Sequence, residues 1–163
     1  MKKNLSQREE IKLIGTKVQT SYKNELDWTA GKIFPCVQKY FHQQLAEKIS
    51  ERKNPGTTFC VYTEYESDYM GDYTYFIGEE VSSIDNIPKD LETLIIPAQK
   101  YIKFTTEPAP MPNAVVDTWK KITQMTANEL GGARRYHSDF EIYDERAHDH
   151  NNLILDIYIG IKS

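Results

Sequence analysis

The chain has 163 residues, 39% of them hydrophobic, and a formal net charge of −4, values typical of one globular domain or two small packed halves. This mild acidity argues against a nucleic-acid-binding surface that covers the protein. No apolar run approaches the ~20 residues that cross a membrane, and we expect no secretory signal because the basic start lacks an apolar segment. Cys36 and Cys60 are expected to be reduced thiols, so we expect a cytoplasmic protein.

The first half of the chain predicts a strand, a helix and a hairpin. In chain order these are a strand at 11–21, a helix within 27–49, and paired strands at 57–65 and 73–81. The helix is indicated by apolar residues at helical spacing from Ile33 to Leu45, with Pro35 in its first turn or at a kink. Gly15 is expected at a bulge or bend of the first strand, and Trp28 precedes the helix in a position compatible with core or pocket.

The second half predicts the same order of elements. They are a strand at 92–107, a helix at 113–130, and a closing hairpin of strands at 140–146 and 152–162. Asn113 is a plausible N-cap and Gly131 a natural stop for the helix. Trp119, at helical spacing, is assigned to the core rather than to a pocket.

The two halves match each other in detail at an offset of about 82 positions. The matched segments are residues 33–40 with 115–122, 75–78 with 157–160 and, one position out of step, 59–62 with 140–143. We therefore predict an α+β fold in which a duplicated β-α-β-β unit packs about a pseudo-twofold axis. The chain is expected to form a single domain, residues 1–163, with half-repeats at about 11–81 and 92–163.

Strand alternation predicts which side chains share a face. Leu155, Ile157, Ile159 and Ile161 form an apolar row that we expect to face the helices, together with Phe140 and Ile142. The residues expected on the opposite, open face are Cys60, Tyr62, Glu64, Thr74, Phe76, Glu141, Tyr143, Glu145, Asp156 and Tyr158. Two such faces, brought together by the pseudo-twofold axis, would form a central groove lined by aromatic rings and carboxylates.

Three segments carry a family resemblance: "IPAQKYIKFTTEPAPMPNAVVDTWKKI", "FEIYDER" and "LDIYIGIK". They resemble the second half of the GyrI-like effector-binding domain family, the ligand-sensing module of multidrug-responsive and AraC-type bacterial transcription activators, which also occurs as free-standing proteins. The resemblance covers essentially the whole chain. It implies a duplicated β-α-β-β fold with a ligand groove between the halves.

The resemblance also implies a role for particular residues. Glu141, within Phe140-Glu141-Ile142-Tyr143, matches the family glutamate that receives cationic, lipophilic ligands, and Tyr143 holds the matching aromatic position. Asp156 stands where the family commonly has a glutamate. The predicted ligand-binding residues are Glu141, Tyr143, Tyr62, Phe76, Glu64, Cys60, Tyr158 and Asp156.

The chemistry of such a groove suits a flat, weakly hydrated cation. An aromatic face contributes roughly 0.5 to 2 kcal/mol per good contact, and a carboxylate in a partly dry groove adds Coulomb attraction. The strand pattern alone would place Glu141 on a solvated face, because Glu is almost never buried without a partner. The duplication and the resemblance reverse that preference.

Two other functions stay open. Some GyrI-like proteins are hydrolases of cyclopropane-containing genotoxins, and Glu141 or Glu64 beside a tyrosine would be the candidates for positioning water. The family is also named after a gyrase inhibitor, so a protein partner is an alternative. We expect no cofactor and no metal, since His148 and His150 belong to a turn. Neither helix resembles a DNA reader, so any role in transcription would act through a separate chain.

Overall fold

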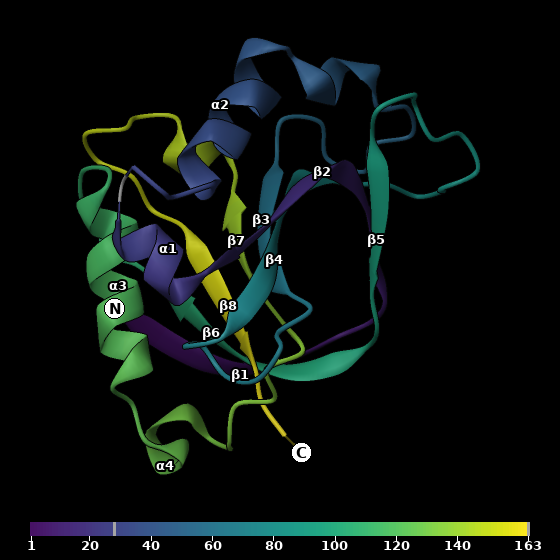
Figure 1. Ribbon diagram of the computed structural model, residues 1–163. Helices are drawn as coiled ribbons and strands as arrows, with labels where there is room; N and C mark the ends of the chain where they lie inside the picture. The colour runs from purple at the N-terminus through teal and green to yellow at the C-terminus, as the bar shows by residue number, and fades with distance from the viewer. Residues whose placement is uncertain (28, 163) are drawn as a thin grey trace.

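The computed structural model describes residues 1–27 and 29–162, so the expectation for Trp28 lies outside the described residues (Figure 1). The strands are β1 (Lys2–Arg8), β2 (Ile11–Ser21), β3 (Thr58–Thr63), β4 (Asp72–Glu80), β5 (Glu92–Ile96), β6 (Gln99–Thr105), β7 (Ser138–Tyr143) and β8 (Asp156–Gly160). The helices are α1 (Tyr22–Leu26), α2 (Ile33–His42), α3 (Asn113–Thr123) and α4 (Ala127–Leu130), with 3-10 turns η1 (Leu45–Lys48) and η2 (Glu145–Ala147). Within these described ranges, no helix has the length and apolar character needed to span a bilayer.

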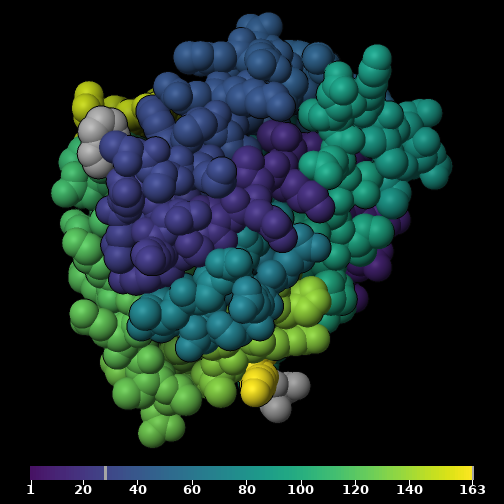
Figure 2. Space-filling view, viewed as in Figure 1, coloured from purple at the N-terminus to yellow at the C-terminus, as the bar shows by residue number. Residues whose placement is uncertain are grey.

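The strands form one antiparallel sheet in the order β1-β6-β8-β7-β3-β4-β2-β5. The order strand, helix, strand, strand occurs twice, as β2-α2-β3-β4 and β6-α3-β7-β8, which confirms the predicted duplicated α+β fold. The halves are joined by the pairing of β3 with β7 at the centre of the sheet. Figure 2 shows the purple and blue residues of the first half packed against green residues of the second.

The sheet curls round and closes on itself. β1 leads directly into β2, and β5 leads directly into β6, so that each pair forms one bent strand. The two bent strands run beside each other, since β1 pairs with β6 while β2 pairs with β5. In Figure 1 this arrangement appears as a ring of strands, with α2 above it and α3 at its side.

Closure gives the sheet a buried face inside and a buried face outside. On the outer face, α2 packs its Cys36 and Tyr40 on one cluster, and α3 packs its Ala114 and Ile122 on a second cluster. The interior holds a third cluster, whose described members all come from strands. Its members are Ile11, Leu13, Phe59, Val61, Phe76, Ile96, Tyr101, Phe140, Ile142 and Tyr158.

The prediction of one helix-covered and one open face is therefore wrong for the central strands. Phe140 and Ile142 lie in the closed interior, whereas Glu141 lies on the outer face, beneath the helices. The error has a physical reason: β1 was not predicted, and without it the sheet has no means of closing. In a closed sheet both faces are apolar, so alternation alone cannot tell which face the helices cover.

Local sequence explains where several elements end. The predicted strand at 92–107 is divided by Pro97 into β5 and β6, because proline cannot donate a ladder hydrogen bond. The predicted helix at 113–130 divides into α3 and α4, and Thr126 forms a capping box with Glu129 at the start of α4. Gly131, with φ of 79°, ends α4 as expected. Gly15 faces Gly78 across the ladder, where an added Cβ would collide with the Ile77 carbonyl oxygen.

Candidate ligand-binding site

Glu141 lies near the middle of β7 and is only 2% exposed. Its carboxylate accepts three hydrogen bonds from aromatic side chains. The Tyr62 hydroxyl donates to Oε2 at 2.9 Å, Trp119 Nε1 donates to the same oxygen at 2.6 Å, and the Tyr143 hydroxyl donates to Oε1 at 2.6 Å. The donors come from β3, α3 and β7, so the carboxylate sits where the two halves of the fold meet.

The sheet register brings these groups together. Cys60 is the direct partner of Glu141 across the β3–β7 pairing, and Tyr62 lies two residues further along β3 on the same face. Helix α3, which packs on the outer face of the sheet, places the Trp119 ring against the Tyr62 ring, with centroids 5.0 Å apart and planes at 61°. We call Tyr62, Trp119 and Tyr143 the aromatic wall, because their half-buried rings stand between Glu141 and solvent.

The charge of Glu141 has no counter-ion among the residues the structure describes: none of the ion pairs within 4.0 Å includes it. Burial raises the pKa of Glu141 above its ordinary value of 4.5, and the hydrogen bonds from Tyr143, Trp119 and Tyr62 oppose part of that rise. Burial also raises the pKa of Tyr62 and Tyr143 well above the usual value, so both hydroxyls remain protonated donors.

Glu141 has hydrogen-bond donors but no counter-ion among the described residues, and these two facts bear differently on what ligand it could bind. The three donors occupy three of the roughly four lone-pair sites of the carboxylate, so a ligand gains little from donating a further hydrogen bond to Glu141. A cation that cannot donate a hydrogen bond can still be attracted by the negative charge of Glu141 and can stack on the faces of the aromatic rings. Because the aromatic wall covers the carboxylate, such a ligand reaches it only when the rings move apart.

Of the predicted site residues, the structure brings Glu141, Tyr143, Tyr62 and Cys60 together on one face. Cys60 is 5% exposed, and burial followed by the nearby Glu141 charge raises its pKa well above the usual value. Glu64 lies beyond the end of β3 and is exposed, so it does not share the buried site.

Phe76, Tyr158 and Asp156 were expected beside Glu141, but the structure places them on the other face of the sheet. Phe76 pairs with Val61 in the interior, and the Tyr158 ring stacks on Phe140 with centroids 4.8 Å apart. Asp156 binds the Arg146 guanidinium at 2.8 Å and the Thr105 hydroxyl at 2.7 Å. The register explains the difference, since each of these residues is one position out of step with the row that contains Glu141.

Trp119 is the site residue that the sequence analysis assigned to the core. It packs against the α3 cluster, yet its indole nitrogen donates directly to Glu141. The aligned residue in the first half-repeat is Val37, which also packs on a core but carries no donor. The sequence did contain a signal for this role: Trp119 stands where the first half-repeat has an aliphatic residue, and a buried indole N–H needs a hydrogen-bond acceptor.

Comparison with known proteins gives a consistent set of relatives. The family described as "Integron-associated effector binding protein", Cass2, matches residues 4–161. The "Putative transcriptional regulator protein YobU" of Bacillus subtilis (strain 168) is 28% identical over 140 residues, which cover 85% of this chain and 86% of that protein.

Two solved structures share the fold. An integron cassette protein from Vibrio cholerae has a TM-score of 0.77 at 22% identity, covering 98% of this chain and 95% of that chain. The structure of SAV2435 bound to tetraphenylphosphonium also has a TM-score of 0.77, at 18% identity, covering 100% of this chain and 95% of that chain.

Proposed function

Because the chain belongs to the Cass2 family of integron-associated effector-binding proteins, we propose that it binds lipophilic organic cations at Glu141. Membership confirms the resemblance to GyrI-like effector-binding domains and supports ligand binding as the general function. The observation that carries the proposal is a buried carboxylate held by three neutral donors with no cationic partner within the described chain.

The energetics favour a large cation over a small one. A buried charge in a medium of low dielectric is costly, and a partner of opposite charge recovers part of that cost. A lipophilic cation carries little hydration to lose, whereas a metal ion or a primary ammonium would have to exchange strong water contacts for a carboxylate that is already hydrogen-bonded. The rings of Tyr62 and Trp119 would then lie against the ligand, with roughly 0.5 to 2 kcal/mol for each good contact.

A charge-removing variant tests the proposal without dismantling the site. In Glu141→Gln the amide oxygen can accept from Trp119 and Tyr62, while the amide nitrogen donates to the Tyr143 hydroxyl. Three hydrogen bonds can still form, the one with Tyr143 in the reverse direction, while the charge is lost. We expect tetraphenylphosphonium to bind the unmodified protein and to bind Glu141→Gln about 10- to 100-fold more weakly, a loss typical of an interaction with a charged group.

Isothermal titration calorimetry measures both affinities directly. Glu64→Gln is the matched control, because it removes the same charge from an exposed position and should leave the affinity unchanged. Equal affinities for the unmodified protein and Glu141→Gln would refute the assignment of the site.

We also propose that residues 1–163 act as one cytoplasmic domain and that any effect on transcription passes through a separate chain. The pairing of β2 with β5 and of β3 with β7 supports this, because each half-repeat (11–81 and 92–163) depends on the other for its sheet neighbours. A single cooperative unfolding transition, seen alike by fluorescence and circular dichroism, is the expected result. Two separate transitions would count against a single domain.

A further inference from the structure

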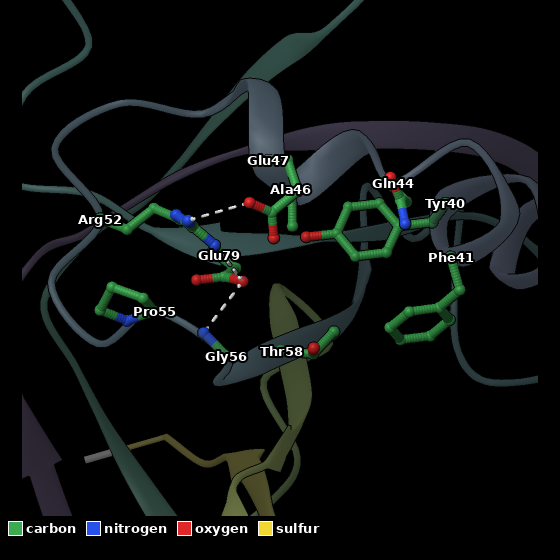
Figure 3. A pocket seen from close by; sticks show the side chains of 10 residues that line it. All are labelled: Tyr40, Phe41, Gln44, Ala46, Glu47, Arg52, Pro55, Gly56, Thr58 and Glu79. Carbon is green, nitrogen blue, oxygen red and sulfur yellow. Dashed lines mark hydrogen bonds and ion pairs between the residues drawn. The ribbon is translucent and has the colours of Figure 1, made fainter.

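A pocket with a volume of about 440 Å³ opens beside α2 and η1, next to the start of β3 (Figure 3). Its size falls within the range of small-ligand sites. Glu79, near the end of β4, and Tyr40, on α2, line the pocket although they are only 2% and 1% exposed. No residue of the aromatic wall lines it, so the pocket is distinct from the site at Glu141.

Two buried polar atoms in this pocket lack partners. Glu79 Oε2 accepts from Arg52 Nη1 and from the Gly56 backbone N–H, each at 3.3 Å. Neither Glu79 Oε1 nor the Tyr40 hydroxyl forms a hydrogen bond with any residue in 1–27 or 29–162. In Figure 3 the Tyr40 hydroxyl points toward the side of the pocket that holds Glu79, whose Gly56-bound oxygen is the one nearer to Tyr40. Buried polar atoms without partners are rare in folded proteins, so this pair requires an explanation.

The charges lining the pocket leave a negative excess. Arg52 is the one cationic side chain among the lining residues, and it faces two carboxylates, Glu79 at 3.3 Å and Glu47 at 4.0 Å. Burial, which outweighs the opposing Arg52 charge, raises the pKa of Glu79. A further positive charge beside Glu79 would relieve the cost of its burial.

We propose that this pocket is a second ligand site, which takes a compact primary ammonium group carrying a small aromatic or aliphatic substituent. One free carboxylate oxygen suits a point donor such as an ammonium better than a planar guanidinium, which binds two oxygens at once. Because both atoms are buried, the side chains that cover them move aside as the ammonium binds, and a second ammonium proton then donates to the Tyr40 hydroxyl oxygen. The substituent covers the ring of Phe41, which lines the pocket and is 54% exposed.

The two sites thus select opposite kinds of cation. Both oxygens of Glu141 already accept hydrogen bonds, which suits a cation without N–H groups, whereas Oε1 of Glu79 accepts none from the described residues and needs a donor. Benzylammonium is a suitable probe for the second site, and benzyl alcohol is its neutral counterpart. Tetraphenylphosphonium serves as the control ligand because it has no hydrogen to donate.

The test is a titration of the ¹⁵N-labelled full chain followed by NMR. We expect benzylammonium to shift the Gly56 amide signal saturably, since that N–H donates to Glu79, and benzyl alcohol to shift it far less. Glu79→Gln should weaken the binding about tenfold or more, as the loss of a charge-assisted hydrogen bond does. Tyr40→Phe, which removes an unpartnered hydroxyl and should fold normally, is expected to weaken it by about two- to fivefold.

Glu141→Gln should bind benzylammonium as the unmodified chain does, which separates this site from the one at Glu141. Equal shifts with benzylammonium and benzyl alcohol would overturn the proposal, as would unchanged affinity in both Glu79→Gln and Tyr40→Phe. Should Glu79→Gln fail to fold, unchanged affinity in Tyr40→Phe alone is sufficient to reject the geometry.

Discussion

Strand β7 carries two buried carboxylates, Asp139 and Glu141, on the same face and two residues apart. Within residues 1–27 and 29–162, only Asp139 has a cationic partner. Asp139 is fully buried, and Arg134 Nη2 donates to its Oδ2 at 2.7 Å. It also accepts from the Tyr65 hydroxyl at 2.7 Å and from the Gly160 N–H at 2.8 Å. Glu141 likewise accepts three hydrogen bonds, but every one of its donors is neutral.

We propose that this difference separates a structural carboxylate from a ligand-binding one. The guanidinium of Arg134 compensates the charge of Asp139 within the fold. At Glu141 the described residues supply three hydrogen bonds but no cationic partner, and the proposed ligand would supply that positive charge. Burial without a counter-ion, rather than burial itself, therefore marks the candidate site.

The largest expected effect follows from breaking the internal pair. Replacing Arg134 with methionine keeps much of the side-chain volume but leaves Asp139 buried beside neutral donors alone. We expect the free energy of unfolding to fall by about 3–5 kcal/mol, the usual consequence of removing one partner of a buried ion pair. Urea denaturation followed by fluorescence measures this change.

Glu141→Gln is the matched comparison for Arg134→Met. It also removes a buried charge, but it leaves no oppositely charged residue of the described chain without its partner. A loss of stability in Glu141→Gln as large as that in Arg134→Met would erase the distinction between the two carboxylates.

A second, smaller effect concerns the pH dependence of stability. The folded-state pKa of Glu141 is raised, so between its ordinary value of 4.5 and the raised value the folded state binds more protons than the unfolded state. The free energy of unfolding of the unmodified protein should therefore fall, relative to Glu141→Gln, as the pH rises through that window. The relative loss is about 1.4 kcal/mol for each pH unit that separates the folded-state pKa from the unfolded-state pKa.

Parallel urea titrations of the two proteins from pH 4 to pH 8 isolate this effect, because all other titrating groups are common to both. A difference in stability that stays constant with pH would mean that Glu141 titrates alike in the folded and unfolded states.

The smallest expected effect comes from Trp119→Phe. The variant keeps an aromatic ring in the wall but loses the indole N–H that donates to Glu141 and offers a weaker face to a cation. We expect the affinity for tetraphenylphosphonium to fall by about two- to fivefold, equivalent to ~0.5–1 kcal/mol. Calorimetry measures this change, and tighter binding by the variant would show that Trp119 only obstructs the site.

Much of the fold could be predicted from the sequence because its signals are local or repeated. The internal match between the halves identified the duplicated unit, and Gly131 ended the second helical region as expected. Closure of the sheet could not be predicted, since β1 is largely exposed and polar and is held by pairing with β6 rather than by its own pattern. Pairing partners far apart in the chain leave no local signal.

The candidate site was predicted in part for the same reason. Glu141 and Tyr143 came from the family resemblance, and Tyr62 and Cys60 came from strand alternation in the first half. The β3–β7 pairing, which was not predicted, is what places them beside Glu141. Phe76 and Tyr158 were assigned to the wrong face because both faces of the closed sheet are apolar, so sequence alternation does not tell the interior face from the outer one. Trp119 required knowledge of how α3 lies on the sheet, which helical periodicity does not contain.

The titration of Glu141 itself, with and without a bound cation, tests most directly whether its charge is available to a ligand. The Glu141 side-chain carboxyl can be followed by ¹³C NMR across pH, first in the free protein and then with saturating tetraphenylphosphonium. Since binding and proton release are reciprocally linked, we expect a raised pKa in the free protein and a lower one in the complex. An identical titration in both states would contradict the account, because the cation would then bind without contact with that charge.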